Sequence, residues 1–533
     1  MWVLKEIQMM RKNPTLSLDS RLAIVLIIYT ISGISLLEYY RYQINPDGIS
    51  YISVAQKYLN CDFGNAVNGY WGPLLSWLLM PFLYFSSDAL LAAKLLSLLI
   101  GLVTIMALRA LSYRFEMTES IRTVILFSAI PIVLTFIFFY ITPDLLLTCI
   151  LLFYLAVIFS ANYAGRINKG ILCGTLGGVA YLSKSFSLPF FISHFLVMNI
   201  IHYFRSETIQ TKKKVVHNFL AGAVVFALIS GVWIDLISNK YGKLTFGASG
   251  KTTYRAAAAP DAQGSAVLWI GFLEPPNETA ISAWEDPSYV KVPAAAAMDS
   301  RSFVKNQLKV VTRHIDKMSN IFMKFSPLSI AIGIAYVLFW MRGFNIKTIR
   351  PEVLYPVVTI ALFVGGYSLV YVEARYLWLI CLMLMLMGGY VLASLFQNNF
   401  FTKTRRTALL IIFFLSFAVP ASLSLKDSAN RGKAIYSLSK ALKSRIPPNR
   451  KIASNASWGG SLYLSYHLDC KYYGAQKKNI SKIELKRQLE KYGIDYYLLW
   501  GGAAPDLRFL SNYEEITGGR IPGLRIYGLK KPR

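Results

Sequence analysis

Long apolar segments are the feature of this sequence that most limits its fold. A helix needs about 20 mostly apolar residues to cross a lipid bilayer. Eleven segments approach that length, although the fifth is short: 21–39, 88–111, 121–140, 144–162, 170–183, 185–203, 216–238, 322–341, 353–371, 377–396 and 407–424. They predict a polytopic α-helical membrane protein with about 11 transmembrane helices.

The composition supports a membrane protein and excludes two other classes. Charged residues make up 16% of the 533 residues and hydrophobic residues 55%, whereas soluble proteins have about 25% charged residues. An ordinary cytosolic enzyme and a disordered chain are therefore both excluded. A net charge of +28 would suggest nucleic-acid binding in a soluble protein. Here we assign the basic residues to loops beside membrane lipid and expect no nucleic-acid partner.

Basic residues in alternate short loops predict the orientation of the chain. Cytoplasmic loops are enriched in Lys and Arg, and the loops on one predicted side carry Arg109, Arg166, Arg205, Arg350 and Arg405 among others. The N-terminus is therefore expected in the cytoplasm and, with an odd number of spans, the C-terminus outside. We expect a multi-pass protein of a bacterial or archaeal cytoplasmic membrane, with its active site on the outer face.

Two domains are predicted. Residues 1–425 form the membrane domain, with outer loops 40–87 and 239–321, and the apolar run 73–85 is too short to span and is expected to lie in the interface. Residues 426–533 are expected to form a small soluble α/β domain outside the cell. In it, 451–458 and 495–500 have strand patterns, and 481–493 has a helix pattern that ends at Gly493. We base no prediction on two alanine runs, 256–259 and 294–297.

Polar residues at the ends of apolar segments are candidates for function, because ionisable groups there are costly. The first cluster is NPDGISY, residues 45–51, which includes Tyr51. Asp47 precedes a glycine, which would let the backbone approach a ligand closely. The alternative is a turn in which Asp47 caps a helix over 49–59. Further on, Tyr70 and Trp71 could stack on a sugar or belong to an interfacial aromatic belt.

The second and third clusters each contain one isolated charge. Asp144 is the only charged residue between residues 123 and 159, although the dipole of a helix would also stabilise a carboxylate at its N-terminus. Lys184 separates two predicted spans and has no acidic residue near it in sequence. Snorkelling to the membrane surface is the alternative. We favour a cation that binds an anionic ligand such as a phosphate.

The fourth cluster is YVEARYLW, residues 371–378, at the outer end of a span. The planar fork of Arg375 matches phosphate oxygens. A direct pair with Glu373 is not expected, because residues two apart on a helix do not share a face. Together the four clusters predict one outward-facing cavity beside lipid, suited to a substrate with a phosphate head and a lipid tail.

These positions resemble the motifs of the GT-C glycosyltransferases: an aspartate in the first outer loop, an acidic residue in TPDLL, a lysine between two later spans, and E-x-R-Y near a late span. Over residues 20–425 the chain is most similar to the ArnT-like and protein-mannosyltransferase-like branch. The resemblance implies transfer of a sugar from a polyprenyl-phosphate-linked donor to a hydroxyl of a glycan, lipid or protein acceptor, with inversion.

The resemblance also implies roles for the site residues. Asp47 would be the general base, Asp144 would shape the acceptor side or assist a metal, and Lys184 and Arg375 would hold the donor phosphate. The remaining candidates would contact substrate: Tyr51, Tyr70, Trp71, Glu373 and Tyr376. Many relatives have two adjacent acids in the first loop, whereas here Gly48 follows Asp47. We therefore assign no metal ligand and no certain cofactor, and a divalent metal stays open.

Two other functions were weighed. A transporter or flippase for a lipid-linked glycan would also contain buried charges, but transporters usually have internal repeats and interrupted helices at mid-bilayer. We find no repeat, and the charges gather at one predicted face. A scaffold with a basic tail would not explain Asp47 and Asp144. In the large outer loop, Glu285 and Asp286 could contact the acceptor or form a turn, and we favour the turn.

Overall fold

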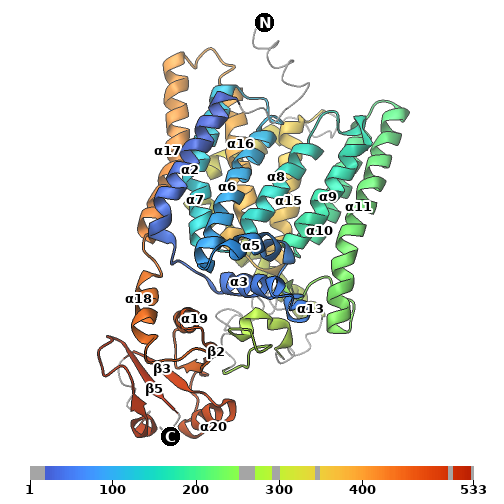
Figure 1. Cartoon of the computed structure of the whole chain (residues 1–533). Helices are drawn as coiled ribbons and strands as arrows, with labels where there is room; N and C mark the ends of the chain where they lie inside the picture. Colours follow the sequence, from blue (N-terminus) through green and yellow to red (C-terminus); the bar gives the residue numbers. More distant parts are fainter. Residues whose placement is uncertain (1–18, 251–270, 291–299, 342–347, 502–507, 530–533) are drawn as a thin grey trace.

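The computed structural model describes residues 19–250, 271–290, 300–341, 348–501 and 508–529. Both alanine runs lie outside these residues. The chain forms a bundle of long helices with a small α/β domain at one end, which we call the domain end (Figure 1). The first turn of α2 (Ser20–Tyr40) lies at the opposite end of the bundle.

A helix lies at each of the eleven predicted segments. After α2 these are α6 (Ala89–Ser112), α7 (Glu119–Phe139), α8 (Asp144–Ile158), α9 (Ile167–Ser183), α10 (Ser187–Arg205), α11 (Ile209–Tyr241), α14 (Ser329–Met341), α15 (Pro351–Val370), α16 (Trp378–Leu395) and α17 (Lys403–Ser428).

The predicted count of eleven spans is not confirmed. Within the described residues, eight helices are long and apolar enough to cross a bilayer, or nine if α14 and the preceding α13 (Ser300–Phe325) form one broken span. The difference has a simple cause, because α8 has 15 residues, α9 has 17 and α14 has 13. Each is shorter than the roughly 20 residues that a straight span requires.

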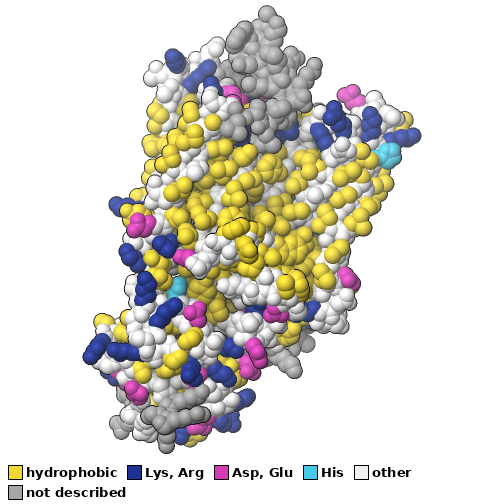
Figure 2. All heavy atoms as spheres, in the orientation of Figure 1, with side chains coloured by type: hydrophobic (Ala, Val, Ile, Leu, Met, Phe, Trp, Pro, Cys, Tyr) yellow, Lys and Arg dark blue, Asp and Glu magenta, His cyan; other side chains and the backbone are white. Residues whose placement is uncertain are grey.

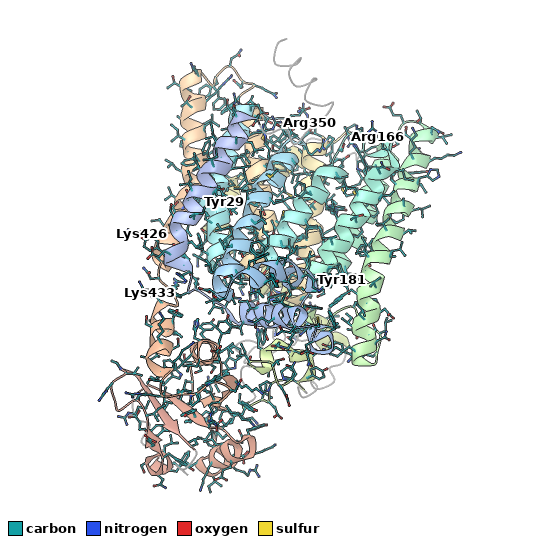
Figure 3. All side chains as sticks on the ribbon, viewed as in Figure 1. Tyr29, Arg166, Tyr181, Arg350, Lys426 and Lys433 are labelled. Atoms are coloured by element: carbon teal, nitrogen blue, oxygen red, sulfur yellow. The ribbon has the colours of Figure 1, made fainter. Side chains whose placement is uncertain are left out.

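An apolar belt surrounds the bundle. On α11, Val224, Leu228 and Val232 are 59%, 66% and 65% exposed, one turn apart, which is the pattern of a helix face turned to lipid. Figure 2 shows hydrophobic side chains across the middle of the molecule and charged ones toward both ends. Arg166 and Arg350, predicted to share a side, lie together at the end opposite the domain end, whereas Lys433 lies at the domain end (Figure 3).

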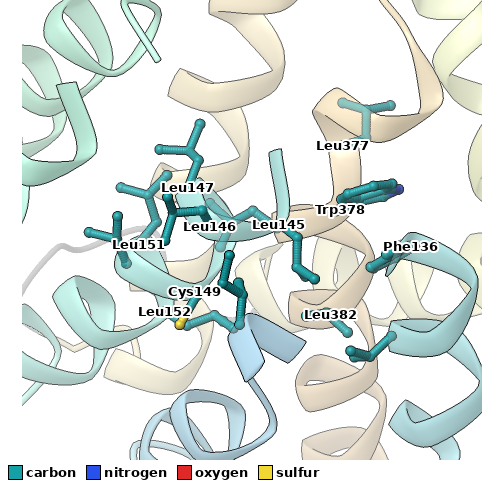
Figure 4. Packing of buried hydrophobic residues seen from close by; sticks show 14 of the residues in the cluster. Phe136, Leu145, Leu146, Leu147, Cys149, Leu151, Leu152, Leu377, Trp378 and Leu382 are labelled. Carbon is teal, nitrogen blue, oxygen red and sulfur yellow. The ribbon is translucent and has the colours of Figure 1, made fainter. Parts of the chain in front are cut away.

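Helix α8 is the interior helix of the bundle. Thirteen of its 15 residues are buried, so its short length does not expose its ends to lipid. Its leucines pack near Leu377 and Trp378 (Figure 4), and Trp378 stacks on Phe136 with ring centroids 4.1 Å apart. Asp144, at the first turn of α8, is therefore carried by a firmly packed element.

Short helices cover the domain end of the bundle. α3 (Pro46–Leu59) and α5 (Pro73–Phe85) run across it in Figure 1 and pack on each other. With 13 residues, α5 is too short to span, in line with the interfacial position expected for residues 73–85. α13 meets α14 at a bend of 112°.

The C-terminal domain contains a five-stranded sheet in the order β2-β1-β3-β5-β4. β1 (Lys451–Ser454), β2 (Lys471–Ala475) and β3 (Tyr496–Trp500) are parallel, and β5 (Leu524–Gly528) and β4 (Glu514–Glu515) add antiparallel strands. Parallel neighbours need crossover connections, supplied by α19 (Trp458–His467) and α20 (Lys482–Tyr492). A strand lies in each predicted strand segment, but β1 ends at Ser454 and Trp458 begins α19, so the second half of the strand predicted over 451–458 is wrong. The predicted helix is confirmed, and Gly493 ends α20 at φ +60°. α18 (Lys433–Leu442) precedes the sheet.

α9 and α11 pack closely through glycines. A Cβ added at Gly174 would collide with the carbonyl oxygen of Gly222, and one at Gly170 would collide with the backbone of Asn218. Small residues spaced four apart allow this backbone approach between helices in a membrane.

We expect Gly174→Ala to lower the thermal stability of the detergent-purified protein. The added methyl would force the two helices apart, and such overpacking typically costs about 1–3 kcal/mol. Gly231→Ala on α11 is the matched control, because a Cβ there has no atom within 4 Å. Equal melting temperatures for both variants would contradict the packing argument.

Candidate active site

A cavity of about 780 Å³ lies at the domain end of the bundle. The nine residues singled out in the sequence all line it: Asp47, Tyr51, Tyr70, Trp71, Asp144, Lys184, Glu373, Arg375 and Tyr376. They come from parts of the chain more than 300 residues apart. The prediction of a shared cavity is therefore confirmed, whereas the role of each residue stays a prediction.

Asp47 lies in the first turn of α3. Pro46 opens that helix and Asn45 is its N-cap residue, so the alternative in which Asp47 caps a helix over 49–59 is wrong. Its carboxylate is held at both oxygens. Arg375 Nη1 donates to Oδ2 at 2.5 Å, and Trp284 Nε1 donates to Oδ1 at 3.0 Å.

Gly48 is explained by the protein itself rather than by a ligand. A Cβ at this position would lie 2.8 Å from Ile141 Cβ and 3.3 Å from the Ile141 carbonyl oxygen. The expectation that Gly48 lets the backbone approach a ligand is therefore wrong. The same contact leaves no room for a second acid after Asp47.

Arg375 lies at the centre of the charged groups. It lies in the 3₁₀ helix η5 (Ala374–Leu377), in the break between α15 and α16. Its Nη1 pairs with Asp47 at 2.5 Å, its Nε pairs with Glu373 at 2.7 Å, and its Nε lies 3.7 Å from Asp144 Oδ2. The prediction that Glu373 and Arg375 do not pair is wrong, because Glu373 precedes η5 in extended backbone (φ −130°, ψ 155°), where the face rule for helices does not apply.

Lys184 has a partner that its sequence neighbourhood does not contain. Its Nζ lies 2.5 Å from Asp144 Oδ1 and 3.5 Å from the centre of the Tyr376 ring. The interpretation of Lys184 as an unmatched cation is therefore wrong. Its backbone is extended at the end of α9, which turns the side chain away from the helix axis and toward α8.

Arg375 and Lys184 both keep unused hydrogen-bond donors. An arginine has five N–H donors and a lysine three. Within the described chain, no hydrogen bond is found for Arg375 Nη2, and Lys184 Nζ donates only to Asp144. The site can therefore accept an anion without first losing its internal ion pairs.

Aromatic side chains form a second wall of the cavity. Trp71 lies 5.9 Å from Trp284 between ring centroids, and Trp284 lies 6.2 Å from Trp458. The three rings come from the first loop, the 239–321 loop and α19, so the C-terminal domain contributes directly to the cavity. Burial, and next the charge of Asp47, raise the pKa of the Tyr51 hydroxyl well above its ordinary value. Tyr51 is therefore a permanent hydrogen-bond donor.

Several residues that line the cavity were not predicted from the sequence. Trp284 stands in AWEDPSY, which was singled out for its acids rather than its ring. Trp458 stands in a segment assigned to a strand, and Tyr140 and Tyr367 carried no distinguishing signal. Lys317, on α13, also lines the cavity, and it was missed because it is one of many basic residues in that segment.

Glu285 holds the 239–321 loop against α3. Its carboxylate accepts from Lys57 Nζ at 2.7 Å and from Ser53 Oγ at 2.5 Å, with the Lys57 and Glu285 side chains only 3% and 4% exposed. Its carbonyl oxygen accepts from Trp71 Nε1 at 2.9 Å. Asp286 accepts from the Ser288 backbone N–H. The favoured turn is confirmed, and Glu285 has a structural contact in place of the acceptor contact considered above.

The carboxylates of the cavity do not offer a free set of metal ligands. Asp47, Asp144 and Glu373 each contact Arg375, and Asp144 also pairs with Lys184. A divalent ion would have to displace these cations. Among the described residues, no group of three or more His, Cys, Asp or Glu side chains is arranged to hold a metal. We derive no step through a metal.

Comparisons with known proteins agree with this architecture. Residues 71–234 match the family described as dolichyl-phosphate-mannose-protein mannosyltransferase. The chain is similar to ArnT from Cupriavidus metallidurans bound to undecaprenyl phosphate, with TM-score 0.57 and 12% identity over 95% of this chain and 99% of that chain. The apo form of that protein gives TM-score 0.54, also at 12% identity and with the same coverage.

A third similar structure is the oligosaccharyltransferase of Archaeoglobus fulgidus tethered with an acceptor peptide, with TM-score 0.50 and 10% identity over 93% of this chain and 72% of that chain. The chain has the GT-C fold. A search of curated proteins found no match. The matched family and the structural neighbours are glycosyltransferases.

We expect Glu285→Ala to destabilise the protein by about 3–5 kcal/mol, because it leaves the buried Lys57 without its carboxylate partner and with only the Ser53 hydroxyl as an acceptor. The measurement is the thermal unfolding of the detergent-purified protein. Glu278→Ala, at an exposed position of the same loop, is the control and should unfold like wild type. Adding Lys57→Met to Glu285→Ala should restore part of the loss. If it does not, the ion pair is not the reason for the instability.

Proposed function

We propose that this chain is a membrane glycosyltransferase that moves a sugar from a polyprenyl-phosphate donor to a hydroxyl acceptor on the extracytoplasmic face. The observation that carries the proposal is the convergence of Asp47, Asp144, Lys184 and Arg375 in one cavity of a GT-C fold. The undecaprenyl phosphate bound to the similar ArnT supports the donor class.

Lys184 and Arg375 are the proposed donor-phosphate ligands. In the reaction the bond between the anomeric carbon and the phosphate oxygen breaks, and the lipid phosphate leaves as an anion. Fixed cations that meet this developing charge lower the barrier. The free donors of Arg375 Nη2 and Lys184 Nζ are available for the phosphate oxygens. Apolar residues on the same cavity wall, Leu188, Ile321 and Val370, suit the start of the lipid tail.

Asp47 is the proposed general base. The acceptor oxygen forms the new bond to the anomeric carbon, and its proton passes to the Asp47 carboxylate. The ion pair with Arg375 places this carboxylate directly beside the proposed phosphate site, so the acceptor hydroxyl and the anomeric carbon would meet between the two groups. A single displacement of this kind inverts the anomeric configuration.

The extracytoplasmic location of the site is supported by the charge distribution. Arg166 and Arg350 lie at the end of the bundle away from the cavity (Figure 3), and cytoplasmic loops are the ones enriched in such residues. The cavity is at the domain end. The C-terminal domain would then stand outside the membrane and cover the acceptor side of the cavity through Trp458.

Asp47→Asn should abolish the outer-surface glycan that depends on this protein. General-base catalysis contributes about 10²–10⁴ in rate, so we expect at least a roughly hundredfold loss of product. The measurement is mass spectrometry of outer-surface glycans from host cells that lack the protein, produce the wild type or produce the variant.

Asp62→Asn is the control for Asp47→Asn, because Asp62 lies in the same outer loop but does not line the cavity. It should support wild-type glycan levels. Near-wild-type product from Asp47→Asn would contradict the base assignment. Identical glycans with and without the wild-type protein would contradict the proposed function itself.

Lys184→Gln should weaken donor binding while leaving the protein folded. A hydrogen bond to a charged group contributes about 1.5–3 kcal/mol, which corresponds to roughly ten- to hundredfold in affinity. The measurement is binding of undecaprenyl phosphate to the purified protein. Lys214→Gln, exposed near the start of α11, is the control. Unchanged affinity in Lys184→Gln would remove the phosphate role of this residue.

A further inference from the structure

Lys317 differs from the other two cations of the cavity. Lys184 and Arg375 are each matched by carboxylates, whereas no ion pair of Lys317 is found within the described part of the chain. Its side chain is exposed, and its Nζ lies 5.2 Å from the centre of the Tyr371 ring. Lys317 therefore carries the one positive charge of the described cavity lining that no carboxylate within ion-pair distance offsets.

The helix that carries Lys317 has three different faces. One face packs on the bundle through Val310, His314 and Met318, which are 2%, 6% and 2% exposed. Beside it runs an exposed apolar stripe at helical spacing: Val304, Leu308 and Ile315, at 55%, 63% and 53% exposed. The remaining face is exposed and mostly basic, with Lys305, Lys309, Arg313 and Lys324 beside one acidic residue, Asp316.

Such a helix fits the surface of a bilayer. An apolar stripe enters the boundary between head groups and acyl chains, and a basic face remains among the head groups. The bend of 112° between α13 and the apolar α14 excludes one straight span and leaves α13 free to lie near the membrane plane. Figure 1 places α13 at the domain end of the bundle, and its residues Lys317 and Ile321 line the cavity.

The cavity continues from Lys317 along α13 to Ile321, one turn further, and to Val370 at the end of α15. A lipid with a single phosphate would meet Lys317 with its head and these apolar residues with its tail. Basic residues near a membrane surface attract anionic head groups. The four other basic residues of the exposed face would raise the local concentration of such lipids.

We propose that α13 lies in the outer membrane interface as the access route of the donor, and that Lys317 is the cation that first binds the donor's lipid phosphate. The inference rests on the proposed function and adds a binding residue to it. The phosphate then passes to Arg375 and Lys184, whose spare donors lie deeper in the same cavity.

The test is binding of undecaprenyl phosphate to the full chain in nanodiscs of zwitterionic phosphatidylcholine. Lys317→Gln is expected to weaken binding about tenfold, the effect of one charged hydrogen bond. Lys309→Gln is the matched control, because Lys309 is exposed on the same helix but does not line the cavity. It should change the affinity less than about twofold, and Lys317→Arg should retain binding, since it keeps the charge.

Equal loss in Lys317→Gln and Lys309→Gln would overturn the proposal, because it would reduce α13 to general attraction of anionic lipid. Unchanged binding in Lys317→Gln would overturn it as well. Binding of undecaprenyl phosphate is measured without sugar transfer, so its outcome is independent of the glycan assay. A wild-type level of activity in Asp47→Asn would contradict only the assignment of Asp47 as the general base.

Discussion

An arginine enclosed within a protein needs carboxylates around it, and this requirement determines how distant parts of the chain meet at Arg375. Its side chain is 11% exposed, pairs with Asp47 and Glu373, and lies near Asp144. Removing one partner from a buried ion pair leaves an uncompensated charge and is strongly destabilising. α3, α8 and the break between α15 and α16 are therefore held to a common point, and Asp144 adds the end of α9 through Lys184.

Nine residues that line the cavity could be identified from the sequence, but their pairing could not. Each isolated charge at the end of an apolar segment was visible, since such charges are costly in a membrane. The partner of Lys184 is 40 residues away and that of Arg375 is 328 residues away, and local spacing does not report such contacts. Residues two apart on a helix do not share a face, but this rule does not apply at Glu373, because the helix is interrupted there. Gly48 was misread for a similar reason, because its constraint comes from Ile141.

The helices were predictable because apolar length is a local property, and a helix lies at each expected segment. Which of these helices can span a bilayer was not predictable, because α8 is shielded by its neighbours and can be shorter than a bilayer is thick. The C-terminal domain shows the same division. β1, β3 and the cap at Gly493 follow from local sequence, whereas β2, β4 and β5 were not predicted. The contact of Trp458 with the cavity depends on how the domain packs on the bundle.

The ion pair between Lys57 and Glu285 has a consequence for the entropy of ligand binding. With both side chains almost fully buried, the loop segment that carries Trp284 is fixed to α3 by the fold itself. The ring of Trp284 therefore does not depend on a ligand for its position in the cavity lining. A ring that is already ordered has little conformational entropy to lose on binding.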